Sequence, residues 1–301
     1  MTLQKIAIFP NSEYDKDFDY TKKAVNIFTK NGISAYLYEN AKPFFEDIPT
    51  SVHFFSDIDQ MIQESDAILV LGGDGTMIDY SLRAAKKDKP AIGVNLGHLG
   101  FLMALERTEM EGLSVLASGD FTVEKRMLLD AEIRLDGQVI HKQRILNDIV
   151  IASGMRSKIA EFSISSQTGG LLAYRADGII VATPTGSTAY SFSAGGPIIE
   201  PTASIISVTP ICPHSLLRRS VLLSSETALV ISGRTRDDMT DIHITMDGKN
   251  SRLIPPEAEI HIKRSPYTVK IIRIGPNRFY DILETKFNKS GQRPQENAHP
   301  F

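Results

Sequence analysis

Residues 67–95 have the sequence AILVLGGDGTMIDYSLRAAKKDKPAIGVN, in which a glycine-rich turn and a helix-forming segment separate two apolar runs. Residues 67–71 and residues 91–95 have the length and apolar character of buried strands, whereas residues 77–86 show helical spacing. A strand, a helix and a strand in this order are typical of two parallel strands joined by a crossover helix.

The same alternation fills the first third of the chain. Its further strands are predicted at residues 5–10 and 34–38, and its further helices at residues 18–30 and 58–64. From about residue 121 the apolar period changes to two, which predicts short strands at residues 131–135, 145–152, 159–165, 171–175, 228–232, 242–246, 259–263 and 268–274.

These patterns predict two domains and a tail. We expect an α/β domain with a parallel sheet over residues 1–120, and a β-rich, sandwich-like domain over residues 121–275. Residues 276–301 are expected to form a C-terminal tail. One alternative is that this tail packs back on the first domain. From residue 286 onward the tail is polar and lacks periodicity, so we expect it to be loose.

Composition excludes several classes of protein. The N-terminal segment is too short and strand-like for a signal peptide, and prolines and glycines interrupt the uncharged residues 178–199, so no membrane helix is expected. The net charge is −3 and no Lys/Arg run interleaves with aromatic residues, which argues against a nucleic-acid partner. The single cysteine, Cys212, fits a reducing compartment. We expect a cytoplasmic protein without nucleic-acid or membrane partners.

The dipeptide Asp-Gly occurs four times, and its ordinary explanation is a hairpin turn. Alternating strands on both sides support that explanation for Asp136. It does not suit Asp74, because a strand precedes this residue and a helical segment follows it. The other two copies begin at Asp177 and Asp247.

The turn at Gly72, Gly73, Asp74, Gly75 and Thr76 therefore presents free backbone N–H groups at a helix N-terminus, which favours phosphate binding. An aspartate among phosphates is unfavourable unless it holds Mg²⁺ or accepts a proton from an attacking hydroxyl. The motif thus favours phosphoryl transfer over binding alone. A plain N-cap and turn is the alternative. No Walker-type or dinucleotide-binding glycine motif is present.

Two further stretches carry polar groups. Residues 183–193 are rich in hydroxyl groups and glycine, and they include one candidate stacking ring, that of Tyr190; a long turn-forming loop is the alternative. Asn147 and Asp148 interrupt an apolar run and would suit the hydroxyl groups of a ribose, although a plain bulge or turn explains them equally.

Some charged residues are weaker candidates. Lys158 and Arg175 lie near Asp177 in the sequence and are candidate phosphate partners, with a solvated surface as the alternative. The seven histidines show no metal-binding spacing, and only His214, beside Cys212 and two prolines, merits a variant. No metal ligand set is assigned.

With these residues in view, the chain resembles the NAD kinase family over most of its length. The resemblance rests on four motifs in order: GGDGT at residues 72–76, NLGHLGFL at 95–102, ND at 147–148 and DGIIVATPTGSTAY at 177–190. The last motif is the most specific, since the first is shared with lipid kinases. Position 148 is Asp where many members have Glu, and position 249 is Lys where a family Asp-Gly-Gln would have Gln.

The resemblance implies that ATP donates its γ-phosphoryl group to the 2′-hydroxyl of the adenosine ribose of NAD⁺, with Mg²⁺ or a similar divalent ion. It implies that Asp74, beside Gly75, activates this hydroxyl and that Asn147 and Asp148 hold ribose hydroxyls. It also implies an α/β domain followed by a β-rich domain, and a homodimer or homotetramer. The base and nicotinamide side of the site is implied to comprise Asp177, Thr188, Ala189, Tyr190, Ser191 and Ser193.

The leading hypothesis is an NAD⁺ kinase whose general base is Asp74. One alternative is a lipid or sphingoid kinase that shares the GGDGT turn, but no amphipathic basic helix supports it. The other is a regulator that binds NAD(H) without chemistry. Asp74 separates these hypotheses, because a protein that only binds has no use for a carboxylate beside phosphates.

Overall fold

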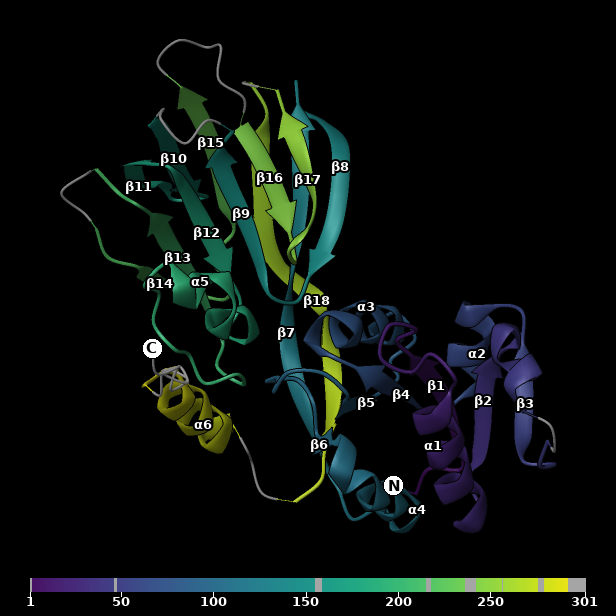
Figure 1. Ribbon diagram of the computed structural model, residues 1–301. Coiled ribbons are helices and arrows are strands. Elements are labelled where there is room, and N and C mark those ends of the chain that lie inside the picture. Colours follow the sequence, from purple (N-terminus) through teal and green to yellow (C-terminus); the bar gives the residue numbers. More distant parts are fainter. Residues whose placement is uncertain are drawn as a thin grey trace, which may run out of the picture. The chain divides into compact units, whose positions relative to one another are not determined.

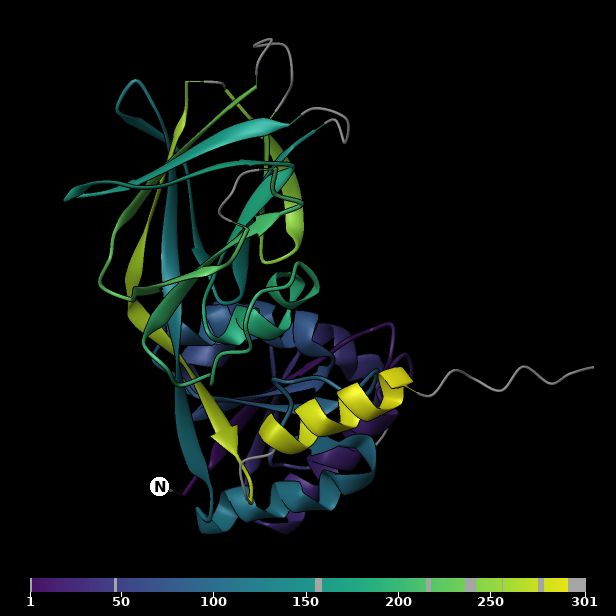
Figure 2. The ribbon, with the colours of Figure 1, turned by 90° about the vertical axis from the view of Figure 1, so that its left-hand side faces the viewer.

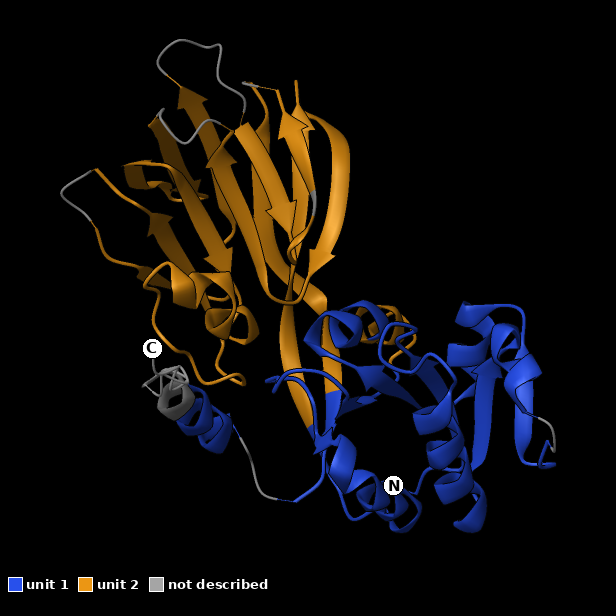
Figure 3. Ribbon diagram, in the orientation of Figure 1, with its two compact units in different colours: residues 1–80, 89–123, 271–301 blue, residues 81–88, 124–270 orange. Residues whose placement is uncertain are grey.

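The computed structural model (Figure 1 and Figure 2) describes residues 2–45, 48–154, 159–214, 218–235, 242–255, 257–275 and 279–291. The chain divides into two compact units (Figure 3). Unit 1 comprises residues 1–80, 89–123 and 271–301, and unit 2 comprises residues 81–88 and 124–270. Within the described ranges, no helix is both long and apolar enough to cross a membrane.

Unit 1 is built on a parallel sheet whose strand order is β18-β5-β4-β1-β2-β3. The strands that it takes from the first hundred residues are β1 (Lys5–Pro10), β2 (Ser34–Tyr38), β3 (Val52–Phe55), β4 (Ala67–Gly72) and β5 (Ala91–Asn95). The short β6 (Leu105–Glu106) pairs with β5. β4 and β5 are buried at every residue, as central parallel strands require.

The helices of unit 1 connect these strands. They are α1 (Asp19–Lys30), α2 (Ile58–Glu64), α3 (Asp74–Ala85), α4 (Val115–Ser118), α6 (Phe279–Gly291) and the 3₁₀ segments η1 (Glu39–Phe44) and η2 (Arg107–Ser114). The core packs the apolar face of α1, including Ala24 and Phe28, with Ile8 and Leu69 of the sheet. The predicted α/β class of this part of the chain is confirmed.

Unit 2 contains two sheets. One has the order β11-β10-β15-β18 together with the hairpin of β7 and β8, and the other has the order β14-β13-β12-β9-β16-β17. The strands are β7 (Thr122–Leu135), β8 (Gln138–Ile145), β9 (Asp148–Ser153), β10 (Ala160–Ser166), β11 (Gly169–Ala176), β12 (Gly178–Ala182), β13 (Ile205–Ile211), β14 (Val221–Ser224), β15 (Leu229–Thr235), β16 (Ile242–Met246), β17 (Lys249–Ile254) and β18 (Glu259–Arg273).

The core of unit 2 combines buried side chains from both sheets, such as Phe162 and Ile231 from one and Ile149 and Val181 from the other. This packing confirms the predicted β-rich class. Two short helical segments, η3 (Thr185–Thr188) and α5 (Tyr190–Ser193), follow β12.

Several predicted elements were wrong in their extent. Residues 259–263 and 268–274 form one continuous strand, β18, because the polar residues between them lie in extended backbone. Strands β3, β8, β13, β14 and β17 were not predicted. Four of them are short or largely exposed, whereas β13 is buried and its serine, threonine and proline interrupt the apolar run. Helix α3 begins at Asp74, three residues before the predicted start.

Part of the expected loose tail is helical. Residues 286–291 belong to α6 (yellow in Figure 2), whose Phe279 is buried with its ring 5.9 Å from that of Phe101. Packing of the apolar residues at the start of α6 stabilises a helix that the polar composition did not predict. Residues 292–301 lie outside the described residues.

Candidate functional site

One group of candidate residues lies in unit 1, at the carboxyl ends of β1 and β4. These strands are neighbours in the sheet. The strand that follows β1 along the chain, β2, lies on one side of this pair, and the strand that follows β4, β5, lies on the other side. Ligands of open α/β sheets bind at such a change of direction. Asn11 follows β1 here, and its Nδ2 donates to Thr76 Oγ1 at 2.8 Å. Its backbone N–H donates to the carbonyl of Leu71 at 2.8 Å.

The glycines of the turn have different roles. A Cβ at Gly72 would lie 3.0 Å from Thr76 Oγ1 and 3.1 Å from Asn11 Cβ, so close packing requires glycine there. A Cβ at Gly73 or Gly75 would meet no protein atom within 4 Å. Gly73 directly precedes the twelve-residue helix α3, and Gly75 lies in its first turn. Backbone N–H groups and the helix dipole favour an anion there.

Asp74 has a fixed orientation. Its Oδ2 accepts the backbone N–H of Phe101 at 2.9 Å, and its Oδ1 accepts that of Leu102 at 3.1 Å. Each carboxylate oxygen can accept more than one hydrogen bond, so both oxygens keep accepting capacity. A Cβ at Gly100 would lie 2.2 Å from Asp74 Oδ1, which means that the loop approaches the carboxylate more closely than any other residue would permit.

At the turn that carries Asp74, a divalent cation fits only together with a nucleotide. Among the described residues, no group of three or more His, Cys, Asp or Glu side chains could form a metal cage. Mg²⁺ is commonly bound by one or two carboxylates together with substrate phosphates. Asp74, at the helix terminus that favours phosphate, is a donor of this type.

Another group of candidate residues lies in unit 2, where the sheet register brings Asn147 and Asp148 beside the segment that follows β12. Asp148 at the start of β9 pairs with Ala182 at the end of β12. The N–H of Thr183 donates to the carbonyl of Asn147 at 2.9 Å, and its Oγ1 donates to the carbonyl of Leu146 at 2.5 Å.

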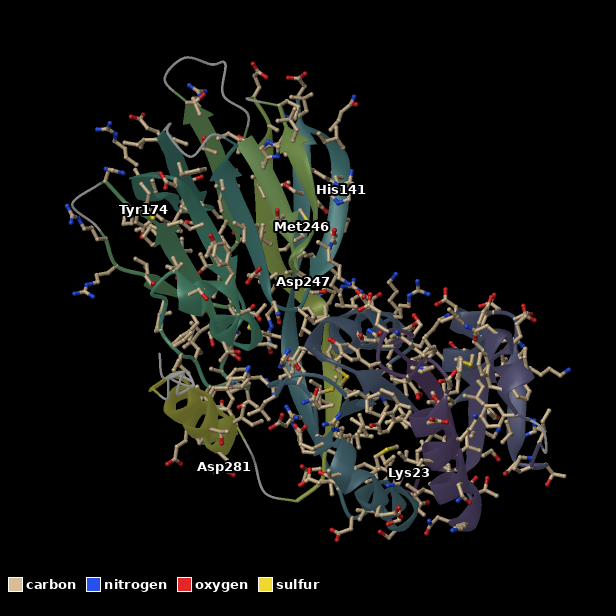
Figure 4. All side chains as sticks on the ribbon, viewed as in Figure 1. Lys23, His141, Tyr174, Met246, Asp247 and Asp281 are labelled. Atoms are coloured by element: carbon tan, nitrogen blue, oxygen red, sulfur yellow. The ribbon has the colours of Figure 1, made fainter. Side chains whose placement is uncertain are left out.

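Asp247 anchors this strand start. It lies in the turn after β16 (labelled in Figure 4), and its carboxylate accepts the backbone N–H groups of Leu146, Asn147 and Asp148 at 3.0, 2.7 and 3.3 Å. In return, its own N–H donates to the carbonyl of Asp148 at 2.9 Å. The positive φ of 51° at Asp247 and of 69° at Gly248 is that of a tight hairpin turn.

Asp148 and Asp247 form a pair of buried carboxyl groups, with exposed fractions of 3% and 9%. Burial and the neighbouring charge of Asp247 raise the pKa of Asp148 to about 7, although the N–H of Tyr190 partly offsets this. Burial raises the pKa of Asp247 to about 6, against three backbone hydrogen bonds that favour its anion. Both carboxyl groups therefore hold their protons to a higher pH than a free aspartate does.

Two buried acceptors at this place have no hydrogen-bond partner within the described part of the chain. They are Asn147 Oδ1 and Thr185 Oγ1. Buried polar atoms are nearly always satisfied, so unpaired atoms beside a loop indicate a place where a polar ligand binds. Gly186 is required here, because a Cβ would lie 2.0 Å from the carbonyl oxygen of Asn147.

The predicted residues after β12 lie in η3 and α5. Tyr190 is 47% exposed and Ser193 is exposed, whereas Ser191 is buried with its Oγ 3.3 Å from Thr209 Oγ1. The Oγ1 of Thr188 donates to the carbonyl of Thr185 at 3.3 Å. The N–H of Ala189 donates to the carbonyl of Gly186. Unit 2 thus brings these residues to the end of β12 that also carries Asp148.

Asp177 is not grouped with them. It lies before β12, at the opposite end of a five-residue strand, about 17 Å away at about 3.3 Å per residue. Arg175 is exposed and its Nε lies 3.5 Å from a carboxylate oxygen of Glu161. The backbone N–H of His214 donates to the carbonyl of Arg175 at 2.7 Å, and this hydrogen bond accounts for the position of His214. Lys158 lies outside the described residues.

Sequence reasoning missed three residues. Asn11 had a usable signal, since it directly follows the first strand at a sheet edge where ligands bind. Asp247 was considered as an ordinary hairpin turn, and its Asp-Gly sequence gives no sign that the carboxylate anchors residues 146–148. Thr185 lay inside the candidate stretch 183–193 but was not singled out.

Comparisons with known proteins agree with this geometry. The family model described as the ATP-NAD kinase N-terminal domain matches residues 29–114, and the one described as the ATP-NAD kinase C-terminal domain matches residues 146–274. An NAD kinase of Caldanaerobacter subterraneus is 37% identical over 290 residues, which cover 95% of this chain and all of the relative. An NAD kinase of Symbiobacterium thermophilum is 41% identical over 75% of this chain and 79% of its own length.

Solved structures share the fold. A yeast NADH kinase complexed with NADH has a TM-score of 0.83 and 21% identity, covering 99% of this chain and 91% of its own. An NAD kinase from Archaeoglobus fulgidus in complex with ATP has a TM-score of 0.68 and 22% identity, covering 95% and 99%. The resemblance inferred from the motifs is confirmed, and neither a lipid kinase nor a regulator without chemistry is favoured. The chain belongs to the NAD kinase family and is a kinase that phosphorylates NAD.

Proposed function

We propose that this kinase transfers the γ-phosphoryl group of ATP to the 2′-hydroxyl of the adenosine ribose of NAD⁺, giving NADP⁺ and ADP. The observation that carries the proposal is the orientation of Asp74 by the N–H groups of Phe101 and Leu102 at the start of α3. A carboxylate held in one orientation suits the acceptance of one particular proton.

In the proposed reaction, Asp74 accepts the proton of the 2′-hydroxyl as the oxygen attacks the γ-phosphorus. The bond from the γ-phosphorus to the bridging oxygen of ATP breaks, and ADP leaves with that electron pair. Because both Asp74 oxygens already accept one N–H each, the carboxylate cannot rotate freely, and its remaining lone pairs point in fixed directions.

The triphosphate is proposed to bind at the turn formed by residues 72–76. Gly73 and Gly75 support this role, since neither position has a protein atom that would meet a Cβ within 4 Å. The N-terminus of α3 supplies backbone N–H donors and a favourable dipole. Mg²⁺ bound with the nucleotide, with Asp74 as a protein donor, would neutralise charge that develops on the phosphates.

NAD⁺ is proposed to bind through polar groups at the start of β9 and after β12. Asn147 and Asp148 are assigned to ribose hydroxyls, which is supported by the unpaired Oδ1 of Asn147 and by a raised pKa that lets Asp148 donate as well as accept near neutral pH. The remaining NAD-binding residues of the proposal are Gly75, Lys158, Arg175, Asp177, Thr188, Ala189, Tyr190, Ser191 and Ser193, of which Asp177 and residues 188–191 are assigned to the base and nicotinamide side. Thr185 joins this set because its buried Oγ1 is unpaired among the described residues.

The remaining expectations are part of the same proposal. The enzyme is proposed to act in the cytoplasm as a homodimer or homotetramer, without nucleic-acid or membrane partners. These statements follow from the family resemblance and from the modest net charge of −3.

The deciding experiment compares wild type with Asp74→Asn in the presence of ATP, Mg²⁺ and NAD⁺, with NADP⁺ measured by an NADP-specific dehydrogenase. The proposal expects the variant to lose at least about a hundredfold in kcat while NAD⁺ still binds. Asp19→Asn is the matched control, because this exposed carboxylate also lies in the first turn of a helix of unit 1. Unchanged turnover of Asp74→Asn would remove Asp74 from the reaction.

A further inference from the structure

The loop that orients Asp74 is itself held from its other side by Arg273, the last residue of β18. Arg273 Nη1 donates to the carbonyl oxygens of Leu102 and Met103 at 3.2 and 2.9 Å. Its Nη2 donates to the carbonyl oxygen of Phe101 at 3.2 Å. One guanidinium group therefore binds three consecutive carbonyl groups.

One peptide group links the two charged side chains directly. The peptide between Phe101 and Leu102 accepts a hydrogen bond from Arg273 on its oxygen and donates one to Asp74 from its nitrogen, at 3.2 and 3.1 Å. The cation thus faces the negative end of the peptide dipole and the anion faces the positive end. Hydrogen bonds in such a chain polarise and strengthen one another.

The close packing of this loop makes its position matter. Gly100 leaves so little room that a Cβ would lie 2.2 Å from Asp74 Oδ1. A small rotation of the peptide planes at Phe101 and Leu102 would therefore turn or displace the carboxylate. Misplacement of a reacting group by about 1 Å can cost about a hundredfold in rate.

Removal of the guanidinium would leave the loop with other contacts. Two residues of α6 contact the ring of Phe101: the ring of Phe279 lies 5.9 Å from it, and the Lys286 ammonium lies 4.2 Å from its centroid. Leu102 and Met103 are buried. The contribution specific to Arg273 is the orientation of the peptide groups, because only the guanidinium contacts their oxygens in a fixed planar fork.

From this geometry we propose that Arg273 is a positioning residue for phosphoryl transfer, which sets the orientation of the Asp74 carboxylate through the Phe101–Leu102 peptide. The inference rests on the proposed role of Asp74 as the base. Arg273 itself contacts no reacting atom in this scheme, so its loss affects the rate of the chemical step and leaves ground-state binding of the substrates largely intact.

The test measures kcat and KM for NAD⁺ and ATP in Arg273→Ala, Arg273→Lys and the control Arg264→Ala. Arg264 lies on the same strand, and its guanidinium donates to Ser225 and Glu226, outside the proposed site. We expect kcat of Arg273→Ala to fall by about tenfold to a hundredfold, with both KM values within about threefold of wild type. The control should match wild type.

A second readout is specific for action through Asp74. Free guanidinium at millimolar concentration should restore part of the turnover of Arg273→Ala and none of that of Asp74→Asn. In the Asp74→Asn background, Arg273→Ala should cost less than about twofold further, since the group that Arg273 positions is already gone. Full additivity of the two substitutions would overturn the inference.

Folding and function can be separated. If Arg273→Ala does not fold, Arg273→Lys decides, because lysine retains a donor but not the fork; wild-type kcat in folded Arg273→Lys would then overturn the inference. If Asp74→Asn is inactive and Arg273→Ala is fully active, only this inference fails. If Asp74→Asn is fully active, the proposed function of Asp74 fails first.

Discussion

The carboxylate of Asp247 holds Asn147 by accepting its backbone N–H at 2.7 Å, and the same carboxylate accepts the N–H groups of the residues on either side. A hairpin turn thereby fixes the start of the neighbouring strand, β9, which begins at Asp148, directly after Asn147. A turn that looks ordinary in the sequence thus supports the proposed ribose site.

Asp247→Asn should destabilise the protein. An asparagine has one acceptor oxygen in place of two, so at least one of the buried N–H groups at residues 146–148 loses its partner, which costs about 1–3 kcal/mol. The free energy of unfolding, measured in urea by circular dichroism, should fall by this amount. Asp136→Asn is the matched control, since Asp136 has nearly the same φ, 50°, in an Asp-Gly hairpin turn but is exposed. Equal stability of the two variants would contradict the anchoring role.

Stability should decrease with rising pH through the titration of Asp148. Burial and the charge of Asp247 raise its pKa from the ordinary 3.8 of an aspartate to about 7, so the folded state binds this proton more tightly than the unfolded chain does. The stability that the proton on Asp148 contributes is fully present below about pH 4 and is lost as the pH rises through about 7. Asp148→Asn removes the titrating group. Its free energy of unfolding relative to wild type should therefore increase between pH 5 and pH 8, and a constant difference would contradict the shifted pKa.

Gly100→Ala should reduce turnover with little loss of stability. The new Cβ would lie 2.2 Å from Asp74 Oδ1, and the end of this side chain is the group that must move out of its orientation. We expect kcat to fall by about tenfold or more while the melting temperature changes little. Gly170→Ala serves as the control, because a Cβ there meets no atom within 4 Å. Unaltered kcat in Gly100→Ala would mean that the orientation of Asp74 does not limit the reaction.

Gly75→Ala should change stability and nucleotide binding in opposite directions. A Cβ at this exposed position in the first turn of α3 meets no protein atom within 4 Å, and alanine favours the helix over glycine by about 0.5–1 kcal/mol. If phosphates bind at this turn, the same Cβ obstructs them. The melting temperature should rise slightly and KM for ATP should increase by about fivefold or more. An unchanged KM would argue against the phosphate assignment.

Much of the fold could be predicted because its signals are local. The buried runs at β1, β2 and β5 and the helical spacing of α1 and α2 are visible in short windows of sequence. The turn at residues 72–76 was recognisable because a strand precedes it and a helix follows it. Most of the strands that were missed are short or exposed, so burial did not impose a clear alternation on them, and in the buried β13 polar residues and a proline interrupt the apolar run.

The sequence by itself determined the parallel α/β part, the β-rich part, the glycine-rich turn at residues 72–76 and the place of Asp74 at a helix N-terminus, since these depend on residues close together in the chain. Only the tertiary structure revealed that Asp247 anchors Asn147, that Arg273 and Asp74 share a peptide group, and that a whole strand separates Asp177 from residues 188–193. Asn147 and Asp247 are 100 residues apart, and Arg273 lies 172 residues beyond Phe101. Hydrogen bonds to backbone groups across such distances depend on strand register and loop path, and they leave no periodicity in the sequence.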